Sequence, residues 1–189
     1  MRIWCIRHGE ATHNIGFLTE GESAYFSTEH QDSVLTCHGE AQARECHIPL
    51  DVTLIAVSPL RRALRTEELA HKPESARRVV LEALCEFPRG HTPNVRCTTL
   101  RNPGFQSLDW SNVPEGRDPW KIGVLESQED LEQRVRELRA WIQDAEDSGC
   151  TGLAIVAHTS VLQELMEEET EMPHAVPVEW MRSQLPDSP

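Results

Sequence analysis

The sequence predicts an α/β protein, a three-layer α/β/α sandwich around a mostly parallel central sheet. Several short apolar runs are each followed at once by polar residues, which is typical of strands buried on both faces. Longer segments with helical periodicity lie between these runs. Strands that alternate with helices form parallel sheets covered by helices on both sides, so this order predicts the layered fold.

The strands are expected where the apolar runs fall. Residues 2–6, 54–57 and 153–157 have the pattern of fully buried strands, and residues 78–81 form a weaker fourth run. All four are short, as strands are, and none has the length of a core helix. We therefore expect these segments to form the centre of the sheet.

Two helices are expected between the first strands. One covers residues 38–46 and follows Thr36, a residue type that favours the N-cap position. The other covers residues 59–70 and has Pro59 just inside its start, where the missing amide hydrogen costs nothing.

A longer helix is predicted to begin after Ser127. Asp130 stands three residues later and completes a capping box, and Gly149 supplies a stop before the last strand. Apolar side chains recur every three or four residues along this helix, which predicts one buried face. These residues are Leu131, Val135, Leu138, Ile142 and Ala145.

The remaining segments are predicted as a lid and a tail of one domain, since 189 residues suffice for one core. Residues 87–126 are rich in Pro, Gly, Asn and Arg, with scattered apolar anchors such as Phe105 and Trp110. We interpret them as a lid inserted into a domain of residues 1–170. The chain turns acidic from Glu167, and residues 171–189 are expected to form a loosely ordered tail.

Composition restricts the partners of this chain. The net charge is −13, from 31 acidic and 18 basic residues, and such a surface repels nucleic acids and anionic membranes. The first residues lack the apolar core of a signal peptide, and the six cysteines show neither a CxxC pair nor a zinc-ligand spacing. We therefore expect a cytoplasmic protein with reduced thiols. The sequence does not indicate an oligomeric state.

Cationic residues follow three of the predicted strands. Arg7 and His8 end the first, Arg61 and Arg62 follow the second, and His158 ends the last. Ligands of open α/β sheets bind at the carboxyl ends of the strands, so these side chains are expected to form one pocket. Guanidinium groups match phosphate oxygens, and an imidazole can attack phosphorus. The pattern thus indicates a site for a phosphorylated substrate.

The same residues resemble the motifs of a known family. Arg7-His8-Gly9-Glu10 with Asn14 resembles the R-H-G-E-x-x-x-N signature of the histidine phosphatase superfamily, also called phosphoglycerate mutase-like. Four further segments match motifs of that family in the right order. Leu35-Thr36 with Gly39 and Gln42-Ala43 resembles L-T-x-x-G-x-x-Q-A, and Ser58-Pro59-Leu60-Arg61-Arg62-Ala63 with Thr66 resembles S-P-L-x-R-A-x-x-T. Leu84-Cys85-Glu86 with Gly90 resembles L-x-E-x-x-x-G, and Val156-Ala157-His158 resembles V-x-H. Together they span residues 1 to about 165, nearly the whole chain.

This resemblance implies a role for each matching residue. His8 would accept the phosphoryl group, and Glu86 would protonate the leaving oxygen and then activate water. The residues that would surround the transferred group are Arg7, Arg62, His158 and Asn14. Arg61 falls on a variable position of the motif, so Arg62 is favoured over it.

The sequence leaves the roles of several residues open. A finer resemblance of residues 94–120 to eukaryotic phosphoglycerate mutase-like phosphatases implies that Arg96 contacts substrate. Thr159, with Ser160, stands where the family has Gly, and either contacts the phosphate or caps a helix whose amides would face it. Arg101 and Arg117 fit salt bridges and substrate contacts equally well. Seven other histidines are expected in the core or on the surface, namely His13, His30, His38, His47, His71, His91 and His174.

The predicted function is hydrolysis of a small or medium phosphorylated compound through a phosphohistidine at His8. This is the reaction of a histidine acid phosphatase-type phosphomonoesterase, and neither a metal nor a cofactor is expected. Two alternatives are kept: a family member that binds phosphorylated ligands or partners without turnover, and a phosphoglycerate mutase. The mutase is disfavoured because its longer insertion and F-T-G-W segment are absent from the sequence.

Overall fold

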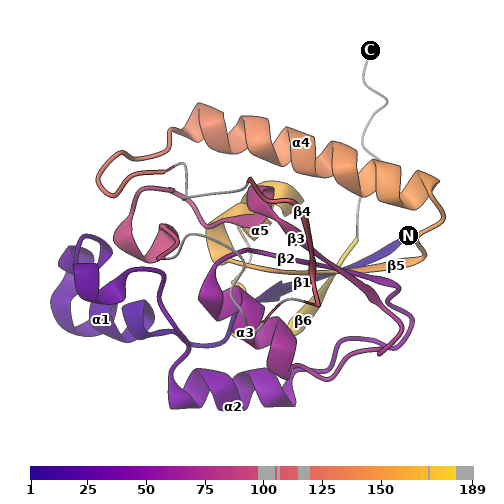
Figure 1. The fold of residues 1–189 in the computed structure, drawn as a ribbon, viewed down its shortest axis with the longest axis horizontal. Helices are drawn as coiled ribbons and strands as arrows, with labels where there is room; N and C mark the ends of the chain where they lie inside the picture. The colour runs from indigo at the N-terminus through magenta and orange to yellow at the C-terminus, as the bar shows by residue number, and fades with distance from the viewer. Residues whose placement is uncertain (98–104, 106, 115–119, 170, 182–189) are drawn as a thin grey trace.

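The computed structural model describes residues 1–97, 105, 107–114, 120–169 and 171–181 (Figure 1). In this part of the chain one sheet has the strand order β4-β3-β2-β5-β1-β6. The strands are β1 (Arg2–Arg7), β2 (Leu54–Val57), β3 (Arg77–Leu81), β4 (Asp109–Asn112), β5 (Gly152–Ala157) and β6 (Pro177–Trp180). All pairs are parallel except β1 with β6, so the sheet is mostly parallel as predicted.

Helices cover both faces of this sheet. They are α1 (Thr12–Glu20), α2 (Cys37–Glu45), α3 (Arg61–Leu69), α4 (Gln128–Asp147) and α5 (Thr159–Met166), with short 3-10 turns η1 (Gly21–Tyr25), η2 (Thr28–His30), η3 (Glu82–Leu84) and η4 (Thr92–Asn94). Figure 1 shows α4 and α5 on one side of the sheet and α2 and α3 on the other. The side chains agree, because Ile3 and Cys5 of β1 pack with α4 and α5, whereas Ile6 packs with α3. The three-layer sandwich is confirmed.

Capping residues set the helix boundaries. Ser127 Oγ accepts a hydrogen bond from the Asp130 amide at 3.2 Å, and Asp130 Oδ2 accepts one from the Ser127 amide at 3.2 Å, which completes the predicted capping box. Thr36 Oγ1 caps α2 by accepting from the Gly39 amide at 2.9 Å. The predicted apolar residues Leu131, Val135, Leu138 and Ile142 of α4 are buried, and each such side chain contributes about 1.5–3 kcal/mol, whereas Ala145 is only partly buried.

The segment expected as a tail contributes to the sheet. Strand β6 pairs antiparallel with β1, and Met172 and Ala175 before it are buried. The expectation of loose order is therefore wrong for residues 171–181, because their apolar side chains complete the edge of the core. Residues 182–189 lie outside the described part.

The segment interpreted as a lid divides into two parts. Residues 87–97 lie beside the carboxyl ends of the strands, where η4 contacts the site described below. Farther along, Phe105 and Trp110 are buried in the core, and β4 pairs with β3, so this part extends the sheet. Arg101 and Arg117 lie outside the described residues. Within the described ranges, no helix is long and apolar enough to cross a membrane.

Candidate active site

The carboxyl ends of the strands bring the predicted cationic residues together. His8 directly follows β1, and its ring centroid lies 5.0 Å from that of His158, which follows β5. Arg62, in the first turn of α3, donates a hydrogen bond from Nε to His8 Nε2 at 3.2 Å. All three side chains are almost fully buried. The convergence expected from the order of strands and motifs is therefore present.

The hydrogen bonds of His8 fix its tautomer. Nδ1 lies 2.6 Å from the carbonyl oxygen of Gly9 and must donate to it, so Nε2 carries the lone pair that accepts from Arg62. Burial and the charge of Arg62 lower the pKa of His8 well below its usual value. The ring is therefore neutral, and a neutral imidazole with a lone pair on Nε2 can act as a nucleophile.

Residues of the other motifs hold the loop that carries His8. The Gly9 amide donates to Thr66 Oγ1 at 3.0 Å, and the Glu10 amide donates to Gln42 Oε1 at 2.8 Å. Thr36 Oγ1 donates to Glu10 Oε1 at 2.6 Å. The L-T-x-x-G-x-x-Q-A and S-P-L-x-R-A-x-x-T matches thus supply side chains that position the nucleophile.

Two glycines allow α2 to approach this loop. A Cβ on Gly9 would clash with the carbonyl of Gly39, and a Cβ on Gly39 would clash with the carbonyl of Glu10. Both obstacles are backbone atoms, which cannot rotate away. The glycines of these two motifs are therefore required by the close packing of the loop on α2.

Arg62 is anchored by the segment that follows Glu86. Its Nη1 donates to the carbonyl of Pro93 at 2.6 Å, and its Nη2 donates to Asn94 Oδ1 at 2.8 Å. Burial lowers the pKa of Arg62 to about 10, so the guanidinium remains charged at neutral pH. This arrangement leaves Nε directed at the nucleophile.

Arg61 is turned away from His8, in agreement with the choice of Arg62. Its amide donates to Asp32 Oδ1 at 3.0 Å, and its Nε donates to the Asp32 carbonyl at 2.9 Å. The other carboxylate oxygen of Asp32 accepts from the Cys97 amide at 3.2 Å. Asp32 thus connects α3 with the lid segment, a role that no motif in the sequence indicated.

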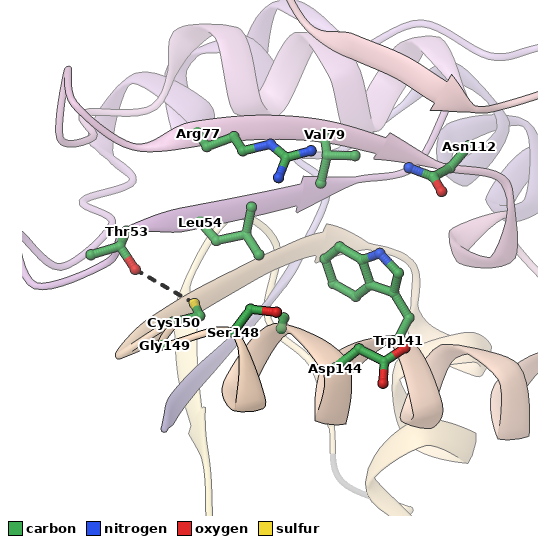
Figure 2. Close-up of a pocket in the computed structure, with 11 residues that line it drawn as sticks. Thr53, Leu54, Arg77, Val79, Asn112, Trp141, Asp144, Ser148, Gly149 and Cys150 are labelled. Atoms are coloured by element: carbon green, nitrogen blue, oxygen red, sulfur yellow. Dashed lines mark hydrogen bonds between the residues drawn. The ribbon is translucent and has the colours of Figure 1, made fainter.

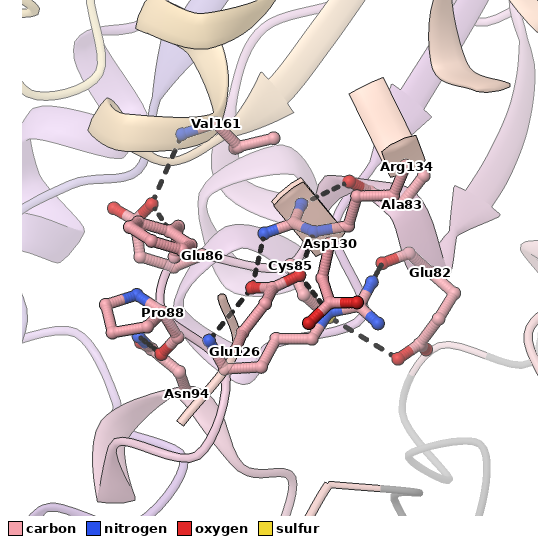
Figure 3. Close-up of polar contacts among 12 residues, drawn as sticks. Glu82, Ala83, Cys85, Glu86, Pro88, Asn94, Glu126, Asp130, Arg134 and Val161 are labelled. Atoms are coloured by element: carbon pink, nitrogen blue, oxygen red, sulfur yellow. Dashed lines mark hydrogen bonds and ion pairs between the residues drawn. The ribbon is translucent and has the colours of Figure 1, made fainter. Parts of the chain in front are cut away.

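Glu86 lies against the N-terminus of α5 (Figure 3). Oε1 accepts hydrogen bonds from the amides of Phe87 at 2.8 Å and Val161 at 3.3 Å, and Oε2 accepts from the Ser160 amide at 3.4 Å. Burial raises the pKa of Glu86 above its usual value, although these amides and Arg62 oppose the shift. A raised pKa suits a general acid. The helix amides expected to face phosphate are thus directed at Glu86, and Thr159 is the half-buried first residue of α5.

A buried ion pair supports the segment that carries Glu86 (Figure 3). Arg134 of α4 donates from Nε and Nη2 to the Glu126 carboxylate at 2.6 and 3.0 Å, and from Nη1 to the Ala83 carbonyl at 2.7 Å. Glu126 also accepts from the Arg89 amide at 3.1 Å. The pair therefore holds the chain on both sides of Glu86.

The predicted substrate residue Arg96 belongs to the same region. Its Nη2 lies 3.2 Å from Glu82 Oε2 in an almost fully buried ion pair. This contact assigns Arg96 a partner within the protein, and a contact with substrate stays a prediction.

Replacing Arg134 should destabilise the protein strongly. Arg134→Met removes both hydrogen bonds from a cation to the buried Glu126 carboxylate and leaves only Arg89, whose Nε lies 3.9 Å away. Breaking a buried pair costs about 3–5 kcal/mol. Arg136→Met is the matched control, since Arg136 is more than half exposed on the same helix. Urea unfolding of both variants measures the effect. Equal, small losses for the two variants would show that the buried pair does not stabilise this region.

Two histidines expected in the core or on the surface lie in the site. The ring centroids of His13 and His174 are 5.8 and 5.7 Å from that of His8. His174 donates from Nδ1 to the His8 carbonyl at 2.7 Å. His13 falls inside the R-H-G-E-x-x-x-N segment, and this position could have indicated it. His174 comes from the supposed tail, where no pattern in the sequence pointed to the site.

The site also contains polar nitrogens without a protein partner. Arg7 donates from Nη1 to the Met172 carbonyl at 3.2 Å, but its buried Nε has no hydrogen-bond partner among the described residues. The same holds for Nδ1 of His158, whose Nε2 is hydrogen-bonded to Ser58 Oγ at 2.8 Å. Buried polar atoms without partners are costly, and an anion beside Arg7 would accept a hydrogen bond from its Nε.

A separate surface cavity of about 380 Å³ lies at the opposite edge of the sheet (Figure 2). It opens where β2, β3 and β5 begin, and its lining includes Thr53, Trp141 and Cys150. Its cation, Arg77, is already paired with Asp109 at 2.8 Å, and its described lining residues include no histidine. His8 and the side chains of Arg7, Arg62 and His158 lie at the other edge.

Comparisons with known proteins match almost the whole chain. The sequence model of the histidine phosphatase superfamily (branch 1) matches residues 3–181. The adenosylcobalamin/alpha-ribazole phosphatase of Salmonella typhimurium is 28% identical over 186 residues, which cover 93% of this chain and 82% of that protein.

Solved structures share the fold. A phosphoglycerate mutase from Thermus thermophilus superposes with a TM-score of 0.56 at 24% identity, over 96% of this chain and 95% of that one. A putative alpha-ribazole-5′-P phosphatase from Escherichia coli gives 0.55 at 22% identity, over 92% and 81%. These relatives are bacterial and do not support the finer resemblance to a eukaryotic group. With the family model matching nearly the whole chain, this protein belongs to the histidine phosphatase superfamily (branch 1).

Proposed function

We propose that this protein is a phosphomonoesterase that transfers the phosphoryl group of a small or medium phosphorylated compound to His8 and then to water. The observation that carries the proposal is the state of His8. Its ring is neutral, its Nδ1 is held by the Gly9 carbonyl, and its Nε2 lies at a buried guanidinium. This arrangement supplies both the nucleophile and positive charge for the group it would attack.

In the first step Nε2 of His8 attacks phosphorus, and the bond from phosphorus to the ester oxygen breaks. The guanidinium groups of Arg7 and Arg62 and the imidazole of His158 stabilise the charge on the equatorial oxygens. Glu86 gives its proton to the leaving oxygen, so the alcohol departs neutral.

In the second step water attacks the phosphoryl group on His8. The ionised Glu86 takes a proton from the attacking water, and the bond between phosphorus and Nε2 breaks. Inorganic phosphate leaves, while His8 and Glu86 return to their starting states. One carboxyl group thus serves as acid and then as base.

The names of two relatives suggest a class of substrate. One is named an adenosylcobalamin/alpha-ribazole phosphatase and the other a putative alpha-ribazole-5′-P phosphatase. In this chain Tyr25 stacks on His91 with centroids 4.8 Å apart, and Phe26 lies edge-on to His91 at 5.3 Å. His91 is two residues before Pro93, whose carbonyl holds Arg62. Ring-bearing phosphate monoesters such as α-ribazole 5′-phosphate therefore belong in the first substrate panel.

The panel should give steady release of inorganic phosphate. A mutase must protect its phosphoenzyme from water while the substrate reorients, and the mutase pattern after Asn14 is absent here. We therefore expect conversion of 3-phosphoglycerate to 2-phosphoglycerate to be slow or absent, even with 2,3-bisphosphoglycerate. Phosphate-release and coupled mutase assays on one preparation test this.

Each alternative has its own signature in these assays. Fast isomerisation that depends on bisphosphoglycerate, with little phosphate released, would identify a mutase. Binding of phosphorylated compounds without turnover of any of them would identify a binding protein.

A further inference from the structure

The unexplained feature of the site is a buried nitrogen of His13. This residue lies in the first turn of α1, is 8% exposed, and has its ring centroid 5.8 Å from that of His8. Its Nδ1 is buried and has no hydrogen-bond partner among the described residues. Buried polar atoms are almost always paired, so an unpaired one beside a nucleophile points to a ligand.

Asn14 determines which nitrogen of His13 carries the proton. The Ala11 amide can only donate, so the Asn14 atom facing it at 2.9 Å must be the oxygen Oδ1. The Asn14 amide nitrogen is then the atom 3.3 Å from His13 Nε2, and it donates to that nitrogen. His13 Nε2 is therefore an acceptor, and the proton must be on Nδ1.

The surroundings keep His13 neutral. Burial, followed by the charges of Arg62 and Arg7, lowers the pKa of His13 to about 2. The ring thus holds a single N–H group, on Nδ1, and this group has no acceptor among the described residues. A fixed donor in the positive field of Arg62 and Arg7 suits an anionic oxygen.

We propose that His13 Nδ1–H binds an oxygen of the phosphoryl group, and that Asn14 sets the tautomer that makes this possible. The inference rests on the proposed phosphoryl site but adds a binding residue to it. His13 occupies an x position of R-H-G-E-x-x-x-N, so the motif itself assigns it no role. The phosphoryl group would then be held by two guanidinium groups and two imidazoles besides the nucleophile.

The direct test uses the unmodified protein. Two-bond nitrogen–hydrogen NMR correlations of the histidine rings should show His13 protonated on Nδ1, and its Hδ1 signal should shift when inorganic phosphate is added. A proton on Nε2, or an Hδ1 signal that phosphate at saturation leaves unchanged, would overturn the proposal. The result does not depend on the folding of a variant, because the measurement uses the unmodified protein.

Calorimetric titration with inorganic phosphate measures the contribution of the hydrogen bond. His13→Phe keeps a ring and removes the donor, and it should weaken phosphate binding about 10–100-fold, as expected for a hydrogen bond to a charged group. His13→Gln restores a donor and should recover part of the affinity. His47→Phe, at an exposed position before β2 and at the opposite edge of the sheet, is the matched control and should bind phosphate as the unmodified protein does.

The outcomes separate this inference from the proposed function. If His13→Phe binds phosphate with unchanged affinity while esters are still hydrolysed, the inference is wrong and the function stands. If no ester is hydrolysed but His13→Phe weakens phosphate binding as expected, the inference stands and the hydrolytic function is wrong.

Discussion

The His8→Ala variant should lose turnover by at least about 10⁴-fold, because it removes the atom that accepts the phosphoryl group. Among the described imidazoles, His8 is the one whose Nε2 accepts a hydrogen bond from Arg62, so we expect no other histidine to replace it. Rapid quenching with a ³²P-labelled ester should trap an acid-labile, base-stable adduct on the unmodified protein, as a phosphoramidate requires. The variant should show no adduct.

His47→Ala serves as the matched control, since His47 is exposed and stacks on His71 in the segments before β2 and β3, at the opposite edge of the sheet from His8. It should retain both turnover and adduct. An adduct that persists in His8→Ala would show that another residue accepts the phosphoryl group.

Glu86→Gln should slow hydrolysis of alkyl phosphates about 10²–10⁴-fold, the usual contribution of a general acid. An alkyl ester leaves as a strongly basic alkoxide and needs a proton, whereas p-nitrophenolate leaves easily without one. The loss with p-nitrophenyl phosphate should therefore be much smaller. Comparing kcat/KM for the two esters measures the difference, and equal losses would indicate that Glu86 is only structural.

The pH dependence of kcat/KM should also reflect the ionisation of Glu86. The pKa of Glu86 is raised, so the carboxyl stays protonated to a higher pH than usual, and activity should fall as pH rises through that pKa. The pKa of His8 is lowered, so the nucleophile stays neutral well into the acid range. Glu86→Gln should remove the alkaline fall of kcat/KM for alkyl esters. A fall that remains in this variant would belong to another group.

Local patterns in the sequence predicted much of the fold and the centre of the site. The capping box at Ser127 and the apolar strands are short-range signals, and both are present in the structure. The convergence of His8, Arg62 and His158 followed from one rule about strand ends. These features need no knowledge of which distant segments pack together.

Features that depend on long-range pairing were missed. His174 reaches His8 only because β6 pairs with β1, and the residues before β6 carry no periodic pattern. The amides of α5 face Glu86 instead of the expected phosphate because the segment before α4 holds Glu86 there. The segment interpreted as a lid divides because β4 pairs with the edge of β3. Apolar and polar residues alternate only over residues 108–111, and this short run does not indicate which strand it pairs with.

The place of β1 in the sheet has a consequence for how the chain folds during synthesis. Among the described strands this one is synthesised first, yet its neighbours are β5 and β6, which are synthesised last. An apolar strand with both edges free must therefore wait until the chain has been made as far as β6. Pairing of such distant segments is slow, so folding should begin around β2 and β3 and reach β1 last. The nucleophile at the end of β1 acquires its geometry only in that final step, and a nascent chain released early would be inactive and prone to aggregate.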